Sequence, residues 1–331
     1  MKLIKNTALI LTIVLSSIWS VLAIYLGNSE TSILQTSLAS IFALFSLSNI
    51  ILLFTRWRKI SLISYFLNFI IVVIAWNFLV QSSNDRLWQL DVAKLPYAEI
   101  NNNLITVHNI RNFSYKNEFD YTPAYYDKTF DLNKLVGADL FAVYWMGDTI
   151  AHTILSFNFD NKDYLAISIE ARKEQNEAYS TFKGFFRQYE LIYIVADERD
   201  VIGLRTNYRK DPIETVYRYP LKPNKENGQR LFLEYIKRVN QLYEHAAFYN
   251  TLLDNCTTSI WFNTLVNENH LPFSWKILLS GYVPEYLYES GRLNTDLPFA
   301  ELKQKALINP IAQKLDLSAS DFSERIREQL P

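Results

Sequence analysis

Two apolar runs separated by a polar turn, Ala151-His152-Thr153-Ile154-Leu155-Ser156-Phe157 … Asp160-Asn161-Lys162-Asp163 … Tyr164-Leu165-Ala166-Ile167-Ser168-Ile169-Glu170, decide the fold. Each run is rich in β-branched and aromatic residues, and the turn residues between them are typical of a tight connection. The stretch therefore predicts a β-hairpin. With the turn centred on Asn161-Lys162, His152 is expected opposite or beside Glu170, although a slip of one residue would turn every side chain to the other face.

Further elements follow from the same kind of pattern. Strands are expected at 140–145, 190–196 and 215–219, and apolar residues at helical spacing predict a helix over 228–243. The tail from residue 316 onward has the composition of a polar surface helix. This order of elements predicts one α+β domain with an antiparallel sheet.

Three long uncharged stretches precede this domain, at 7–27, 32–54 and 61–80. About 20 helical residues cross the roughly 30 Å hydrocarbon core of a bilayer, so each stretch is long enough to span a membrane. Three such stretches in tandem argue against buried helices of a soluble protein. We therefore expect a membrane region over residues 1–80 and a separate domain over residues 81–331.

The flanking cations indicate the orientation of the spans. Lys2 and Lys5 precede the first span and Arg56, Arg58 and Lys59 lie between the second and third, whereas the loop at 28–31 has no cation. Because cytoplasmic loops carry the excess of Lys and Arg, the N-terminus is expected in the cytoplasm and residues 81–331 outside it. Cleavage of the first span as a signal peptide, after Val21-Leu22-Ala23, would leave two spans and the same location for the domain.

Overall composition excludes several classes of function. The chain has 33 Lys and Arg against 34 Asp and Glu, so no basic footprint for nucleic acid is visible. Its histidines and its single cysteine lack metal-ligand spacing, and its eight glycines form no phosphate-binding loop. No metal and no cofactor are expected. A single cysteine cannot form an internal disulfide, and outside the cytoplasm it is either reactive or protected.

That cysteine, Cys256, lies in the run Asp254-Asn255-Cys256-Thr257-Thr258, directly before an apolar helix-like stretch at 259–266. Asp254 or Asn255 is a natural N-cap, which would place the thiol in the first turn of the helix. Exposed N–H groups and the helix dipole favour a thiolate there. The alternative is a buried small apolar residue, as most free cysteines are.

A thiol nucleophile needs a base, usually a histidine that a third polar group orients. His108, His245 and His270 have the settings of surface or capping residues. His152 differs because it begins an apolar strand beside a second strand that carries Ser168 and Glu170. A satisfied core histidine is the alternative interpretation of His152.

An ordered set of short motifs resembles a known family, DUF4105, also described as the Lnb N-terminal periplasmic domain. The matching residues are Arg111-Asn112-Phe113, Ala151 to Phe157, Ser168-Ile169-Glu170-Ala171-Arg172, Tyr189-Glu190, Asp197-Glu198-Arg199-Asp200-Val201, Leu204-Arg205-Thr206, and Phe248-Tyr249-Asn250-Thr251 running into Asn255-Cys256-Thr257-Thr258. They cover about half of the chain, from residue 107 to about 265.

The resemblance implies a fold and a pair of catalytic residues. The family looks like a circularly permuted relative of papain-like NlpC/P60 enzymes, with the histidine before the cysteine. Its namesake is a bacterial lipoprotein N-acyltransferase, which implies Cys256 as the acyl-accepting nucleophile and His152 as the base. The three spans depart from the namesake, whose periplasmic domain comes first.

These roles complete a hypothetical site. The Cys256 thiolate would form a thioester, with the oxyanion held by the N–H of Cys256 and a neighbouring donor such as Asn255. Glu170, preferred over Ser168, would fix the tautomer of His152. Arg172 and Arg199 would bind an anionic headgroup, or else form structural ion pairs with Glu170, Glu190 or Asp200.

Three functions remain open at this point. The first, which tethering to the membrane favours, is a thiol-dependent acyltransferase in the bacterial inner membrane with a phospholipid or lipoprotein as partner. The second is a cysteine amidase or peptidase acting on cell-wall peptides from the same periplasmic position. The third is a non-catalytic membrane-anchored module with Cys256 merely buried.

Overall fold

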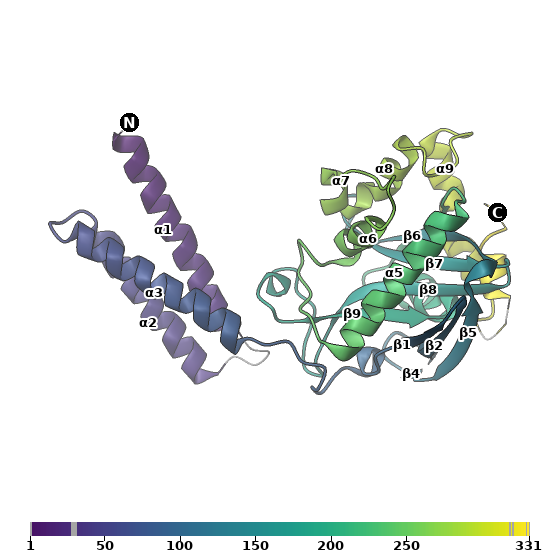
Figure 1. Cartoon of the computed structure of the whole chain (residues 1–331), viewed down its shortest axis with the longest axis horizontal. Coiled ribbons are helices and arrows are strands. Elements are labelled where there is room, and N and C mark those ends of the chain that lie inside the picture. Colours follow the sequence, from purple (N-terminus) through teal and green to yellow (C-terminus); the bar gives the residue numbers. More distant parts are fainter. Residues whose placement is uncertain (1, 28–31, 318, 320, 329, 331) are drawn as a thin grey trace.

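The computed structural model describes residues 2–27, 32–317, 319, 321–328 and 330. It begins with three long apolar helices, which Figure 1 shows to one side of an α+β part. Their bounds are α1 Lys2–Tyr25, α2 Ile33–Leu52 and α3 Arg58–Leu79. At 1.5 Å per residue, the shortest of them, with 20 residues, is about 30 Å long. The prediction of three membrane-length helices is confirmed, while the cation-free loop at 28–31 lies outside the described residues.

A few polar contacts hold the helices of this bundle together. The hydroxyl of Tyr65 on α3 lies 2.7 Å from Ser16 Oγ and 2.9 Å from Ser17 Oγ on α1. Ser61 donates to the backbone oxygen of Asn49 on α2. Hydroxyls and small residues at such interfaces are typical of helices that associate within lipid, where apolar packing gives no preference for protein over acyl chains.

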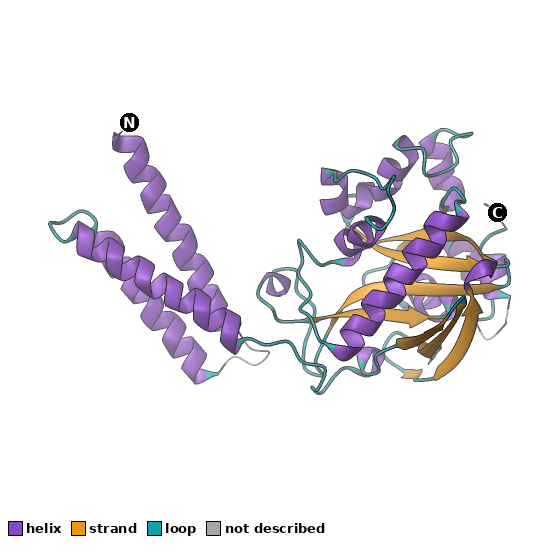
Figure 2. Cartoon of the chain, viewed as in Figure 1, coloured by secondary structure: helices purple, strands orange, loops and turns teal. Residues whose placement is uncertain are grey.

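The α+β part is built on an eight-stranded sheet, shown in orange in Figure 2. Its order is β1-β2-β9-β8-β7-β6-β10, and β5 pairs with β2 outside this path. The strands are β1 Tyr97–Asn101, β2 Leu104–Arg111, β5 Tyr125–Asp131, β6 Leu135–Tyr144, β7 Ala151–Phe159, β8 Asp163–Arg172, β9 Glu190–Ala196 and β10 Thr215–Pro220. A separate two-stranded ribbon pairs β3 Ser114–Tyr115 with β4 Tyr121–Thr122.

The sheet is mixed, which corrects the prediction of an antiparallel one. β2 and β9 run parallel and meet at one residue pair, Arg111 with Ala196, while the other neighbours are antiparallel. This parallel junction joins the N-terminal strands to the central ones. Because it is a single residue pair between strands far apart in the sequence, no local sequence pattern could have predicted it.

Helices cover the two faces of the sheet. The longer ones are α4 Glu198–Gly203, α5 Lys225–Glu244, α6 Cys256–Thr264, α8 Val283–Glu289 and α9 Phe299–Ala306, and the four-residue ones are α7 Trp275–Leu278, α10 Asn309–Ala312 and α11 Phe322–Arg325. Short 3-10 turns lie at Leu90–Val92, Leu132–Lys134, Lys183–Phe185 and Ser280–Tyr282, and a π-helix, η4, at Leu204–Tyr208.

We name the two sheet faces after the helices that cover them. On the α5 face, Leu155, Phe157 and Tyr193 pack against Phe232 and Tyr235 of α5. On the α4 face, buried side chains of the central strands and of α4 form a second cluster that includes Ile154, Ala166, Ile194, Val201 and Ile202. Side chains alternate along a strand. On β7, β8 and β9, buried apolar residues with odd numbers therefore join the cluster of the α5 face, and those with even numbers join the cluster of the α4 face.

The predicted hairpin is present as β7 and β8. Ile154 faces Ser168 and Phe159 faces Asp163, so the register matches the prediction for His152 and Glu170. Asp160 and Asn161 make the turn with positive φ angles of 55°, a conformation that Asn and Asp tolerate better than most residues. Backbone pairing between β7 and β8 ends at Ile154 and Ser168, whereas β7 remains paired with β6, and β8 with β9, beyond that point.

The C-terminal tail differs from the predicted surface helix. Within its described part it forms only the short helix α11, and Phe322, Ile326 and Arg327 are buried. The tail closes the α4 face, where Phe322 and Ile326 join the apolar cluster and Arg327 enters a buried ion network.

Candidate functional site

Cys256 is the first residue of α6, and Asn255 is its N-cap. The side-chain oxygen of Asn255 accepts from the backbone N–H groups of Thr257 and Thr258, each at 2.9 Å. In return, Asn255 N donates to Thr258 Oγ1 at 3.0 Å, which completes a capping box. The side-chain amide of Asn255 donates to the carbonyl of Thr251 at 2.7 Å. Asn255 therefore supports the start of the helix, and its amide donor, proposed for the oxyanion, is bonded to the preceding loop.

The thiol itself is half-buried and packs against the apolar cluster of the α5 face. Its Sγ lies 3.6 Å from the Oγ1 of Thr257. Thr257 in turn lies 3.1 Å from Thr153 Oγ1, which fixes the first turn of α6 against β7. In the described chain, the backbone N–H of Cys256 has no hydrogen-bond acceptor. It is thus available to an oxyanion formed at this sulfur.

His152 belongs to a linear chain of polar groups. Its Nε2 lies 2.7 Å from Ser168 Oγ, and Ser168 Oγ donates to Glu170 Oε1 at 2.7 Å. Since the serine proton is directed to the carboxylate, Ser168 accepts from Nε2–H, which leaves Nδ1 as the basic nitrogen. Glu170 is 3.6 Å from Nε2 and acts through the serine. Of the two residues predicted to fix the tautomer, Ser168 therefore contacts the imidazole directly, and Glu170 lies behind Ser168.

Arg205 anchors the far end of this chain. Its Nη2 donates to Glu170 Oε1 at 2.9 Å, and its Nη1 lies 3.3 Å from Glu214. Arg205 comes from the π-helix η4, an uncommon element that is frequent at functional sites. The sequence reasoning assigned no role to Arg205, although the residue lies in one of the motifs that carried the family resemblance.

Burial and these partners set the charges of the site. Burial, reinforced by Arg205 and opposed by Glu170, lowers the pKa of His152 to about 3, so the imidazole is neutral at pH 7. Burial alone would raise the pKa of Glu170, but Arg205, His152 and Arg209 hold it well below its usual range. The site therefore combines a neutral imidazole with an ionised carboxylate.

Cys256 and His152 belong to elements that are in contact, but the two side chains do not bond to each other. Thr153 and Thr257, the residues that follow them, are in contact, yet His152 has Ser168 as its partner and the described residues show no hydrogen bond between the thiol and the imidazole. Alternation along β7 places His152 on the α4 face, whereas α6 packs on the α5 face. The backbone pairing of β7 with β8 stops at Ile154 and Ser168, two residues after His152 on β7.

The two arginines proposed for an anionic headgroup have structural partners instead. Arg172 is 2% exposed and donates to the carbonyls of Val92 and Ala93 and to Asn84 Oδ1. Arg199 donates to the carbonyl of Leu317 and lies 3.9 Å from Asp197. Neither arginine touches the polar chain of His152. The carboxylates that were expected to pair with these two arginines are paired with other arginines instead.

Glu190 pairs with Arg86, at 3.0 Å, and Asp200 pairs with Arg111, at 2.9 Å.

The described residues contain no group of three or more His, Cys, Asp or Glu side chains placed to hold a metal ion.

The His152→Gln variant is expected to be less sensitive to acid than the wild type. The unfolded imidazole has a pKa of about 6.5 and the folded one about 3, so between these values the unfolded state binds the extra proton and stability falls as the pH falls. Thermal unfolding of the full chain in detergent, compared at pH 7 and pH 4, measures the effect. The exposed His245→Gln serves as the control, and parallel curves for His152→Gln and wild type would contradict the buried neutral imidazole.

The family comparison bears on the segment that contains this site. Residues 121–281 match the family model described as the Lnb N-terminal periplasmic domain. The matched segment includes Cys256, His152, Ser168, Glu170 and Arg205, and it leaves the three membrane-length helices outside. Searches of curated proteins and of solved structures find no match. The chain thus combines three membrane-length helices with a segment similar to a periplasmic domain.

Proposed function

We propose that this protein is a membrane-anchored thiol acyltransferase whose donor and acceptor are a phospholipid and a lipoprotein or other lipid amine. The observation that carries the proposal is an apolar surface beside Cys256 that is continuous with the membrane helices. The domain would have a permuted papain-like arrangement, and the chain would lie in the bacterial inner membrane with its N-terminus in the cytoplasm and residues 81–331 in the periplasm.

The apolar surface is made of two loops, which we call the apolar rim. Its exposed side chains are Tyr179, Phe182, Phe185, Leu252 and Leu253, which are 41–58% exposed. The loops are joined where Thr251 N donates to the Gly184 carbonyl at 3.3 Å and Thr251 Oγ1 to the Thr181 carbonyl at 2.7 Å. The second loop runs directly into Asn255 and Cys256.

The first loop also contacts the membrane helices. Phe186 is buried in a cluster with Ala23 and Leu26 of α1, and Trp76 of α3 packs at its edge. The guanidinium of Arg187 lies 3.9 Å from the centre of the Trp76 ring. Since Trp76 is near the end of α3 and Leu26 follows α1, the apolar rim lies at the level where the helices leave the bilayer. Acyl donors are present at that level.

The chemistry then follows in two steps. The Cys256 thiol transfers its proton to Nδ1 of His152 and its sulfur attacks the ester carbonyl carbon of the donor. The N–H of Cys256 binds the resulting oxyanion. Collapse breaks the ester C–O bond, the alcohol leaves with the proton from His152, and a thioester remains on Cys256.

An amine then attacks the thioester carbon, an amide bond forms, and the C–S bond breaks. The amine proton returns through His152 to the sulfur. The first transfer requires the Cys256 side chain to leave Thr257 and to approach His152, since the described residues show no contact between the two groups. Hydrogen bonds of this kind commonly tighten only when substrate is bound.

Mass spectrometry of the full chain in phospholipid nanodiscs tests the proposal. The expected result is one acyl adduct, located on the peptide that contains Cys256 and removed by neutral hydroxylamine, as a thioester would be. Cleavage of a cell-wall peptide without an acyl adduct would replace the transferase with an amidase or peptidase. A protein that forms no adduct and cleaves no peptide would overturn both enzymatic functions and leave a non-catalytic module.

Charges on the apolar rim are expected to slow reaction with membrane lipid selectively. The double variant Phe182→Asp/Leu253→Asp should reduce the adduct rate with phospholipid by about tenfold or more, since losing about 1.4 kcal/mol of apolar insertion suffices for that factor. With a water-soluble short-chain ester its rate should stay within about twofold.

The matched control is Phe119→Asp/Leu104→Asp, which changes two side chains that are 87% and 48% exposed but lie away from the apolar rim. Equal losses in the two double variants, or equal losses with both kinds of ester, would show that the apolar rim does not position lipid.

A further inference from the structure

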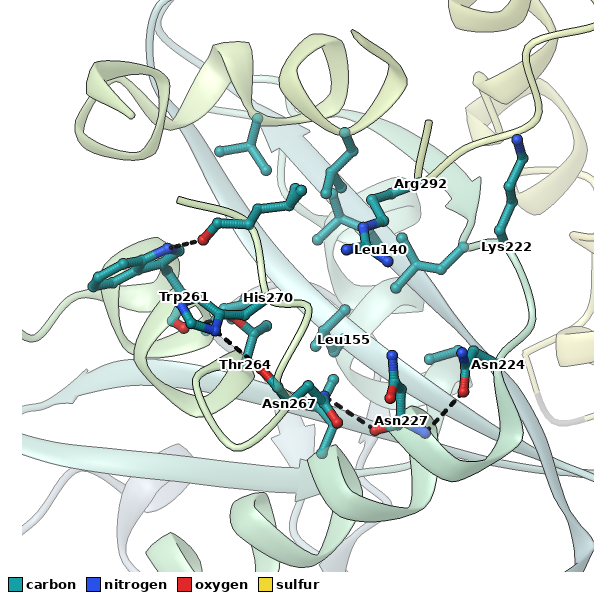
Figure 3. Close-up of a pocket in the computed structure, with 18 of the residues that line it drawn as sticks. Leu140, Leu155, Lys222, Asn224, Asn227, Trp261, Thr264, Asn267, His270 and Arg292 are labelled. Atoms are coloured by element: carbon teal, nitrogen blue, oxygen red, sulfur yellow. Dashed lines mark hydrogen bonds between the residues drawn. The ribbon is translucent and has the colours of Figure 1, made fainter. Parts of the chain in front are cut away.

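An apolar cavity lies on the α5 face between α5, α6 and α8. Figure 3 shows its wall, with Leu140 and Leu155 of the sheet opposite Trp261 of α6. Its volume is about 200 Å³, and its aliphatic lining includes Leu140, Leu155, Leu231, Ile260, Val283 and Leu287. An apolar cavity of about 150 Å³ is large enough to bind benzene, so this one accommodates at least a six-carbon segment.

The cavity begins one side chain away from the nucleophile. Thr257 and Thr153 both line it, and their hydroxyls lie 3.1 Å apart. The Sγ of Cys256 is 3.6 Å from the same Thr257 hydroxyl. Cys256 also packs against the apolar cluster to which Leu140, Leu155 and Leu231 belong. The threonine pair, which is buried, therefore separates the sulfur from the aliphatic lining, and a chain attached to the sulfur would have to displace it to enter the cavity.

Several polar groups in the lining are bonded to the protein itself. Trp261 Nε1 donates to the Leu271 carbonyl at 2.9 Å, and Asn267 Oδ1 accepts from Arg230 Nε at 2.9 Å. Asn224 accepts from the backbone of Asn227, as the dashed lines in Figure 3 show. The lining has no carboxylate, so a cationic ligand would lose its hydration without gaining a counterion there. An alkyl chain meets no such cost.

We propose that this cavity binds the aliphatic chain of the acyl group carried by Cys256. The inference rests on the proposed thioester for its orientation, with the carbonyl carbon at the sulfur and the chain between α6 and the sheet. It adds a selectivity: each further methylene that enters the cavity should favour the longer donor by about fourfold, until the cavity is full. Donors with two-carbon acyl groups should therefore react far more slowly than donors with chains of eight carbons or more.

Photolabelling with a twelve-carbon diazirine fatty acid tests the cavity independently of turnover. The full chain in nanodiscs, with Cys256→Ser to prevent chemistry, should be labelled within 257–264 and 277–287, and an excess of unlabelled fatty acid should remove the label. Val283→Phe fills the cavity and should abolish this labelling. Val266→Phe is the matched control, since Val266 lies at the surface after α6 and is absent from the lining.

The outcomes separate this inference from the proposed function. Label confined to the spans or the apolar rim, in a protein whose wild type still forms the Cys256 adduct, would overturn the cavity and leave the transferase. Cavity labelling in a protein that forms no adduct would support the cavity and overturn the thioester. Should Val283→Phe fail to fold, the positions labelled in the Cys256→Ser protein still decide whether the cavity binds the chain.

Discussion

Replacing Cys256 with serine is expected to reduce the rate of acyl transfer by at least about three orders of magnitude. Removing the nucleophile alone commonly lowers the rate as much as removing the nucleophile and its base together. The hydroxyl is nearly isosteric, and the α6 cap formed by Asn255, Thr257 and Thr258 does not involve the sulfur. The fold should therefore persist while the thioester does not form. Adduct formation and amide product, both measured by mass spectrometry in nanodiscs, provide the readout.

The control for this variant is its thermal midpoint, which should remain close to that of the wild type since only a half-buried sulfur is changed. A Cys256→Ser protein that keeps its transfer rate would eliminate the thiol as nucleophile. One that loses both activity and stability would show that the sulfur serves the packing of the α5 face instead.

Arg327→Met is expected to destabilise the protein by about 3–5 kcal/mol, the usual cost of removing one partner of a buried ion network. Arg327 donates to Asp139 at 2.7 Å and to Glu198 at 2.6 and 2.7 Å. Its guanidinium also lies 3.7 Å from the centre of the Tyr164 ring. Arg218 still neutralises Asp139 in the variant, at 2.6 Å, but Glu198 is left buried without its cation.

Denaturant unfolding of the full chain in detergent measures this loss, with Arg325→Met as the matched control. Arg325 is 48% exposed and pairs with its sequence neighbours Asp321 and Glu328, which are themselves exposed, so its loss should cost less than about 1 kcal/mol. Burial alone would raise the pKa of Glu198, but Arg327 holds it low, so the stabilisation is present above about pH 4.5 and is lost as the pH falls through the folded value. Equal losses in the two variants would contradict the network.

Local patterns in the sequence predicted much of this structure. The three membrane-length helices follow from uninterrupted apolar runs, and the β7–β8 hairpin follows from two strand-like runs around Asp160 and Asn161. The start of α6 was predicted for the same reason, since Asn255 needs only the next three residues to form its cap. In each case the determining residues lie within one element or one turn.

The features that sequence reasoning missed depend on distant partners. Arg327 meets Glu198 across 129 positions, so the tail resembled a solvated helix. Arg172 was predicted to bind an anionic headgroup or to form a structural ion pair, but folding surrounds it with backbone carbonyls. Arg205 reaches Glu170 across 35 positions, which local spacing cannot show. Within the site, the spacing of Ser168 and Glu170 predicted that both lie on the same face of one strand. Which of them contacts His152 depends on side-chain rotamers, which the sequence does not determine.

The joined loops of the apolar rim have a mechanical consequence. From Phe186 among the membrane helices, contacts run through the Gly184 carbonyl to Thr251, and from the Thr251 carbonyl to the side chain of Asn255, which caps the helix that begins with Cys256. A side chain at Gly184 would collide with Thr251 Oγ1, because a Cβ built there lies 2.2 Å from it. In the proposed enzyme, this short path would set the height of the sulfur above the bilayer surface. Substrate bonds would then be selected by their depth in the membrane.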